Sequence, residues 1–194
     1  MTPDWVPPSL LDPRVMLMVP RGERDALTSL WKLEARLFGV VAQRREMVLA
    51  QIKLAWWRER LDQVAAAPET LPKGEPLLAE LAATWAGRAS LAPVAEAYEA
   101  IMMSEDSEEL ALAGAALATS MQAGQSWGLA RASQLVGSEA LAAATWAQVA
   151  TASMEAAPRH VRTLDRWGKL LAKGAGSALP RAEGWLLLRA GMGL

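Results

Sequence analysis

The sequence predicts an all-α protein with a single helical domain, and three observations support this. Hydrophobic residues make up 52% of the 194 residues, which is enough to form one core. Alanine and leucine are abundant while β-branched residues are sparse, a balance that favours helices over strands. Apolar residues also recur three and four positions apart along much of the chain, as they do on one face of a helix.

The composition narrows the chemistry and the partners. There is no cysteine, which excludes disulfides and thiolate metal sites. His160 is the only histidine, so no histidine pair can bind a metal, and we do not expect it to be catalytic. A net charge of -1 gives no overall attraction to nucleic acid, and none is expected as a partner. The start of the chain lacks the layout of a signal peptide, so the expected location is cytoplasmic.

The chain begins with a segment, 1–20, that contains five prolines and is predicted to be irregular, with one short helical turn. The domain is expected to span 21–194. Its first helix starts at Arg21 or Gly22 and carries apolar residues at helical spacing as far as Val41. Glu34 is the only polar residue on that face. A buried carboxylate needs a partner, so it either pairs with an arginine of the next helix or faces a cavity.

The second predicted helix runs from Glu46 to about Ala66 and holds the pair Trp56-Trp57. These tryptophans lie on different faces of the helix, which predicts that it packs on both sides. They are interpreted as core residues, with the wall of a long apolar pocket as the alternative. The residues that would form this wall are Trp31, Glu34, Phe38, Trp56 and Trp57.

More helices are predicted after a surface loop at 69–76. The first two are expected at 77–85 and from Pro93 to Ile101. The next begins at a cap, which is Ser104, Asp106 or Ser107, and runs to Val136, with a bend or a continuation near Gly124. The last three are expected from Ser138 to Ala152, at 159–173 and, after a loop at 174–180, at 183–189.

The densest group of carboxylates comprises Glu105, Asp106, Glu108 and Glu109. Glu105 and Glu109 share a helix face if the segment is helical, and oxygen ligands at this spacing can bind Mg²⁺. Glu105, Asp106 and Glu109 are therefore candidate metal ligands. The alternative is that these acids stabilise the positive end of a helix.

The helix at 159–173 is basic and amphipathic. From Arg159 onward the chain has seven basic and two acidic residues, against 13 and 19 before it. Its basic face comprises Arg162, Arg166, Lys169 and Lys173, opposite an apolar face of Val161, Leu164, Trp167 and Leu171. A helix of this kind can lie on a membrane surface or can pack against a core with its charges in solvent, so peripheral membrane contact is one expected alternative.

The stretch Ile52-Lys53-Leu54-Ala55-Trp56-Trp57-Arg58-Glu59-Arg60-Leu61-Asp62 resembles the I-R-L-Q-W-W-R-x-x-L-D motif of the squalene/phytoene synthase family. The segment from Pro20 through Leu33-Glu34-Ala35-Arg36-Leu37 is similar to the family's P-x-x-R-x-A-L-x-A-L-Y-A-F-N-x-E-L opening. The resemblance is clear over about 18–64. It implies an isoprenoid-synthase-like helical bundle, here in a truncated and divergent form.

Active members of that family condense two prenyl diphosphates, and they use two aspartate-rich motifs to bind Mg²⁺ and the diphosphates. Here Glu34 is the only acid between Thr28 and Arg45, and the acids after Gly124 are not three or four residues apart. The sequence therefore lacks both motifs. If the chain were active, the resemblance implies Mg²⁺ as cofactor, with Arg58 or Arg60 as candidate phosphate ligands.

Three functional hypotheses follow. The first is a pseudoenzyme that has lost condensation and works as a binding or assembly module, with a protein partner or an apolar isoprenoid ligand. The second is a residual Mg²⁺-dependent prenyl transferase in squalene, carotenoid or hopanoid biosynthesis. The third is a peripheral membrane protein that uses 159–173.

Overall fold

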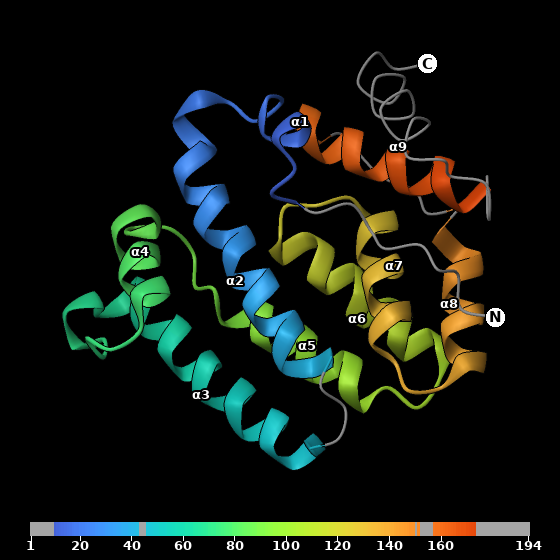
Figure 1. Cartoon of the computed structure of the whole chain (residues 1–194), viewed down its shortest axis with the longest axis horizontal. Helices are drawn as coiled ribbons and strands as arrows, with labels where there is room; N and C mark the ends of the chain where they lie inside the picture. Colours follow the sequence, from blue (N-terminus) through green and yellow to red (C-terminus); the bar gives the residue numbers. More distant parts are fainter. Residues whose placement is uncertain (1–9, 43–45, 150, 152–156, 174–194) are drawn as a thin grey trace.

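The computed structural model of the chain describes residues 10–42, 46–149, 151 and 157–173. All regular secondary structure within these residues is helical, which confirms the predicted all-α class. Figure 1 shows a bundle in which the long helix α2 crosses the middle, α3 and α4 lie at one side, α8 lies at the other and α9 runs along the top.

The first helices follow the predicted apolar pattern closely. They are α1 (Pro13–Met16), the 3₁₀ turn η1 (Arg21–Glu23), α2 (Arg24–Ala42) and α3 (Met47–Ala66). The expected start at Arg21 is thus a 3₁₀ turn that leads into α2. The side chain of Asp12 accepts a hydrogen bond from the backbone N–H of Arg14 and so caps α1, as short polar side chains commonly do.

Prolines mark the beginnings of the next elements. These are the 3₁₀ turn η3 (Pro68–Thr70), α4 (Pro76–Trp85) and α5 (Ala92–Met103). Proline suits the first turn of a helix because the N–H it lacks has no intrahelical partner there. The loop predicted for 69–76 is shorter than expected, since η3 takes its first residues and α4 begins at its last.

The segment that was predicted to continue or bend forms two helices, α6 (Ser107–Ser120) and α7 (Gln125–Leu135). The chain turns between them at Gln122, which has a φ of 50°. The two helices approach closely at Gly114 and Gly128. A Cβ atom on Gly128 would collide with the carbonyl oxygen of Gly114, so the absence of a side chain at this position permits the contact.

The last described helices are α8 (Glu139–Val149) and α9 (Arg159–Lys173). Ser138 precedes α8 as predicted, and its Oγ accepts from the backbone N–H of Leu141 at 3.4 Å. The loop and helix expected at 174–180 and 183–189 lie outside the described residues.

The core is organised around α7, which contacts α5, α6, α8 and α9. Nine of its 11 residues are buried, including the polar Ser126, Arg131 and Ser133. Among the described helices, none has both the length and the apolar character that crossing a membrane requires. The burial of α7 places its charged and polar side chains at the centre of the bundle, where they need hydrogen-bond or ion-pair partners.

Candidate functional site

A buried polar cluster joins three helices at the centre of the bundle. Glu34 of α2 is only 4% exposed. The hydroxyl of Tyr98, in α5, donates to Oε1 of Glu34 at 2.8 Å. Nε of Arg131, in α7, lies 2.9 Å from the same oxygen and forms an ion pair with it. The partner of Glu34 is therefore not an arginine of the next helix, as one reading of the sequence expected, but one from a distant part of the chain.

Aromatic rings hold the guanidinium group of Arg131 in place. Its central carbon lies 4.3 Å from the ring centroid of Phe38 and 5.4 Å from that of Trp127. Its Nη1 also donates to the side-chain oxygen of Gln134 at 3.1 Å. Cation–π contacts of this kind strengthen when water is excluded, and Arg131 is only 6% exposed. The arginine is thus fixed by packing as well as by charge.

Burial governs the protonation of this cluster. Removal from water raises the pKa of Glu34, while the charge of Arg131 and the hydrogen bond from Tyr98 act in the opposite direction. Burial and the neighbouring carboxylate keep the pKa of Tyr98 well above its usual value, so its hydroxyl stays protonated and donates. Glu34 is therefore committed to two internal partners, and its role in this structure is to neutralise Arg131.

A second buried group lies beside the first. Nε1 of Trp31 donates to the backbone carbonyl of Met121 at 2.9 Å. The ring of His160, in α9, meets that of Trp31 edge to face at a centroid distance of 6.2 Å. Both ring nitrogens of His160 are buried without a hydrogen-bond partner among the described residues. Burial lowers the pKa of His160, which keeps the imidazole neutral at neutral pH.

The two adjacent tryptophans of α3 have different environments. Trp57 is 4% exposed and belongs to the same core cluster as Trp31. Trp56 is 37% exposed and meets Trp57 edge to face at 5.2 Å. Ile52, one turn before Trp56, is 60% exposed. The expectation that α3 packs on both sides was wrong, because only the face of Leu54 and Trp57 turns inward.

The two candidate phosphate ligands already have acidic neighbours. Nη1 of Arg58 donates to Oε2 of Glu99 in α5 at 2.7 Å. Arg60 forms an ion pair with Glu59 at 3.2 Å and donates to the side chain of Gln63 at 2.8 Å. A bound phosphate would compete with these contacts for both guanidinium groups.

The acidic group before α6 stabilises the start of that helix. Oδ1 of Asp106 accepts hydrogen bonds at 2.9 Å from the backbone N–H groups of Glu108 and Glu109. Oε2 of Glu109 accepts at 3.0 Å from the backbone N–H of Glu105. This arrangement is a variant of the capping box. Within the described part of the chain, no group of three or more His, Cys, Asp or Glu residues is placed to hold a metal ion.

The basic helix α9 packs against the bundle through its apolar side. Val161 and Leu164 are buried, while Arg162 and Arg166 are exposed. Lys169 forms an ion pair with Asp165 at 2.6 Å. The side chains of Trp167, Leu171 and Lys173 lie outside what the structure describes.

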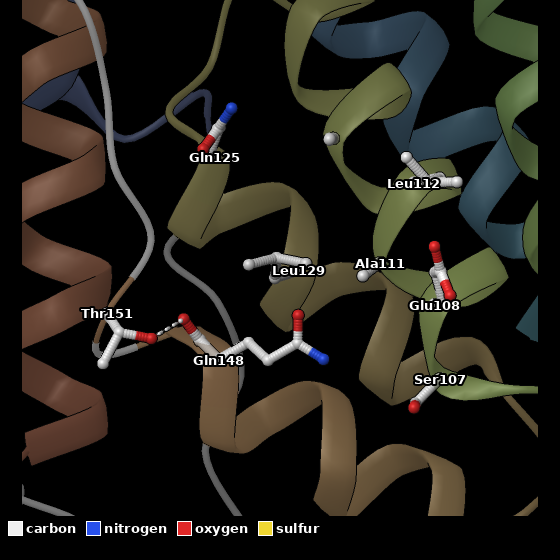
Figure 2. Close-up of a pocket in the computed structure, with 9 residues that line it drawn as sticks. Ser107, Glu108, Ala111, Leu112, Gln125, Leu129, Gln148 and Thr151 are labelled. Carbon is white, nitrogen blue, oxygen red and sulfur yellow. Dashed lines mark hydrogen bonds between the residues drawn. The ribbon is translucent and has the colours of Figure 1, made fainter.

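A pocket of about 490 Å³ lies between α6, α7 and α8, and its lining includes no residue of the buried cluster. Figure 2 shows Ala111 and Leu129 in its middle, with Gln125 and Ser107 at opposite ends. Its lining residues are Ser107, Glu108, Ala111, Leu112, Ala115, Gln125, Leu129, Gln148 and Thr151. None of the five residues proposed from the sequence as a pocket wall is among them.

No motif or spacing pattern in the sequence indicated that Tyr98, Trp127 or Arg131 would belong to the site. One signal for Arg131 exists, because it is the only charged residue between Leu110 and Leu135. A lone charge in an apolar segment is expected to be buried with a partner of opposite sign. Tyr98 is the only tyrosine, but nothing in its spacing indicates the contact with Glu34.

No protein-family model, curated protein or solved structure matches the chain.

Proposed function

We propose that this chain is a non-catalytic helical binding module with a squalene/phytoene-synthase-like fold. The observation that carries the proposal is the state of Glu34. The resemblance implies that the first metal-binding acids lie on the helix before Trp56-Trp57. That helix is α2, and Glu34 is the acid on its apolar face. Its carboxylate is instead shared between Tyr98 and Arg131 in a closed, buried cluster.

The other candidate groups support the same proposal. Asp106 and Glu109 accept backbone N–H groups at the start of α6, and Arg58 is paired with Glu99. A diphosphate leaving group needs cations to offset its charge. Recruiting these residues to bind metal and diphosphate would require breaking contacts that stabilise the fold.

The proposal is tested by incubating the chain with Mg²⁺ and farnesyl or geranylgeranyl diphosphate. We expect no release of diphosphate and no change in melting temperature with either ligand. Diphosphate release by the original chain would identify a residual prenyl transferase and overturn the proposal. Loss of that release in a Glu34→Gln variant that keeps its helix content would assign the activity to this carboxylate.

An apolar isoprenoid alcohol or hydrocarbon is a candidate ligand for this binding module, and the pocket between α6, α7 and α8 supports it. The middle of this pocket is apolar, and its edges carry amide and hydroxyl groups and the carboxylate of Glu108. An apolar surface with a few polar groups is the usual composition of a small-molecule site. Ala115→Phe would fill the pocket and should abolish binding of farnesol. Ala116→Phe, at an exposed neighbour outside the lining, should leave binding unchanged.

A further inference from the structure

The outward face of α3 carries a cluster of exposed apolar side chains. Val48, Ile52 and Trp56 follow each other at intervals of four residues and so lie on one face of the helix. They are 69%, 60% and 37% exposed. Leu49, three residues before Ile52, widens this stripe and is 41% exposed. Met47, one turn before Gln51, is 50% exposed and lies at the margin of the stripe. We call this group the α3 patch.

The α3 patch continues onto the neighbouring helix. Met103, at the end of α5, is 58% exposed, and its sulfur accepts a hydrogen bond from the side-chain amide of Gln51 at 3.2 Å. Figure 1 shows α3 at the outer edge of the bundle, with α4 near its far end. The patch is therefore presented by the side of the molecule and not by a crevice within it.

The size of the α3 patch matches an interaction surface. Covering the exposed part of one large apolar side chain removes on the order of 100 Å² from water. Full cover of the six side chains gives about 600 Å² per copy, the upper end of the range for the largest apolar patch on a typical monomer. Two copies facing each other would then bury at most about 1,200 Å², which is the lower end of the range of stable interfaces.

The charges around the α3 patch favour a protein partner over a membrane. Exposed Glu46 and Lys53 have opposite signs, and Glu59 is paired with Arg60. Over the described residues 46–66, three basic and three acidic side chains balance. An interfacial helix on an anionic membrane needs a rim rich in Lys and Arg, and α3 does not provide one.

The order of side chains along the α3 patch is self-complementary. Val48 and Trp56 lie four residues before and after Ile52. When two copies of α3 cross in antiparallel fashion with Ile52 at the twofold axis, each Val48 lies beside Trp56 of the other copy. A small side chain then meets a large one, the alternation that fills a helix–helix interface. The edge-to-face contact with Trp57 holds Trp56 in position.

We propose that the α3 patch binds a second copy of this chain in a symmetric dimer centred on Ile52. The inference deepens the proposed binding function by naming the partner. In a twofold interface the same patch serves both subunits, so a single substitution changes the contact twice. Its test uses no prenyl diphosphate, and the two proposals therefore succeed or fail separately.

The first experiment measures the mass of the full chain by light scattering at about 1 µM to about 100 µM. We expect a dimer that dissociates on dilution. Ile52→Glu brings two carboxylates together at the axis and should weaken the dimer by about 100-fold or more. Because Ile52 is exposed, the variant should keep the helix content and melting behaviour of the monomer. Leu17→Glu, at a separate leucine that is 75% exposed, should leave the dimer intact.

The second experiment uses the lack of cysteine in the chain. A disulfide requires Cβ atoms about 4 Å apart, so oxidised Ile52→Cys should give a covalent dimer in high yield. Leu17→Cys, which lies away from the proposed axis, should stay mostly monomeric under the same oxidation.

Two results in solution would overturn the proposal, and a third, with vesicles, would contradict it as well. One is a chain that is monomeric at every concentration. The other is a dimer that survives Ile52→Glu unchanged and forms no disulfide through Ile52→Cys, since the dimer would then use another surface. Flotation with neutral vesicles that Ile52→Glu abolishes, in a chain that stays monomeric without them, would assign the α3 patch to lipid and contradict the proposed partner.

Discussion

The carboxylate of Glu34 lies 2.9 Å from Nε of Arg131, and this contact joins α2 to α7 across the buried centre of the bundle. Both side chains are almost fully buried, at 5% and 8% exposure. Neither charge would be tolerated there without the other. The pair therefore ties the N-terminal half of the fold to the C-terminal half, and the first prediction concerns its removal.

Arg131→Met should lower the free energy of unfolding by about 3–5 kcal/mol, because it leaves the carboxylate of Glu34 buried without its countercharge. Tyr98→Phe removes one hydrogen bond to a charged group and should cost about 1.5–3 kcal/mol. Urea unfolding followed by circular dichroism measures both losses. The double variant Glu34→Met with Arg131→Met should be clearly more stable than Arg131→Met alone. A double variant that is less stable would show that Glu34 is stabilised mainly by other contacts.

Gly128→Ala should destabilise the chain through the contact between α6 and α7. The added Cβ would collide with the carbonyl oxygen of Gly114 and lie 2.7 Å from Cβ of Ala118. Forcing a methyl group into such a contact costs about 1–3 kcal/mol.

Gly39→Ala is the matched control, since Gly39 lies in α2 with open space around the position that an added Cβ would take. Alanine should be neutral there or stabilise the helix by up to about 1 kcal/mol. Thermal unfolding of both variants gives the comparison. Equal melting temperatures would mean that α6 and α7 are not in such close contact in solution.

Local patterns in the sequence predicted the helices well. The three- and four-residue spacing of apolar side chains located α2, and Pro93 lies in the first turn of α5 as expected. Three residues competed in the sequence as the cap of α6, and the structure selects Asp106. These features depend on neighbours within a few residues along the chain, which is why the sequence alone reveals them.

Contacts between distant segments could not be predicted in the same way. Spacing shows that Glu34 shares a face with apolar residues, but it does not show which helix covers that face. The partner Arg131 comes from α7 and Tyr98 from α5. Spacing also gave α3 two apolar faces without indicating which one meets the core. Ile52 and Trp56 are exposed because their face has no helix packed over it in the described part of the chain.

Stability should fall as the pH decreases through about 6.5, the ordinary pKa of histidine. Burial lowers the pKa of His160 in the folded state, so the unfolded chain takes up this proton first. The unfolded state then binds more protons, and the free energy of unfolding decreases as the pH falls towards the lower folded pKa. His160 is the only histidine. The raised pKa of Glu34 acts in the opposite direction, because a carboxyl whose pKa rises on folding stabilises the folded state as the pH falls, so the His160 contribution is isolated by substitution.

Urea unfolding at several pH values between about 5.5 and 7.5 measures this slope. His160→Leu should flatten it, whatever its effect on absolute stability. A slope that is equally steep in His160→Leu would show that other groups cause the pH dependence.

Asp106→Ala separates a structural role of the acidic group from a metal-binding one. Loss of the two hydrogen bonds to the backbone of Glu108 and Glu109 should lower the free energy of unfolding by about 0.5–2 kcal/mol. Asp106→Asn keeps an oxygen that can accept a hydrogen bond at the start of α6, so its free energy of unfolding should be close to that of the original chain.

Because the carboxylate of Asp106 caps α6, millimolar Mg²⁺ should not raise the melting temperature of the original chain. If Asp106 were instead a metal ligand, Mg²⁺ would stabilise the original chain by mass action, and both variants would lose that response. Asp106→Asn decides between the two roles, since an amide retains the cap but weakens a site that depends on carboxylate charge.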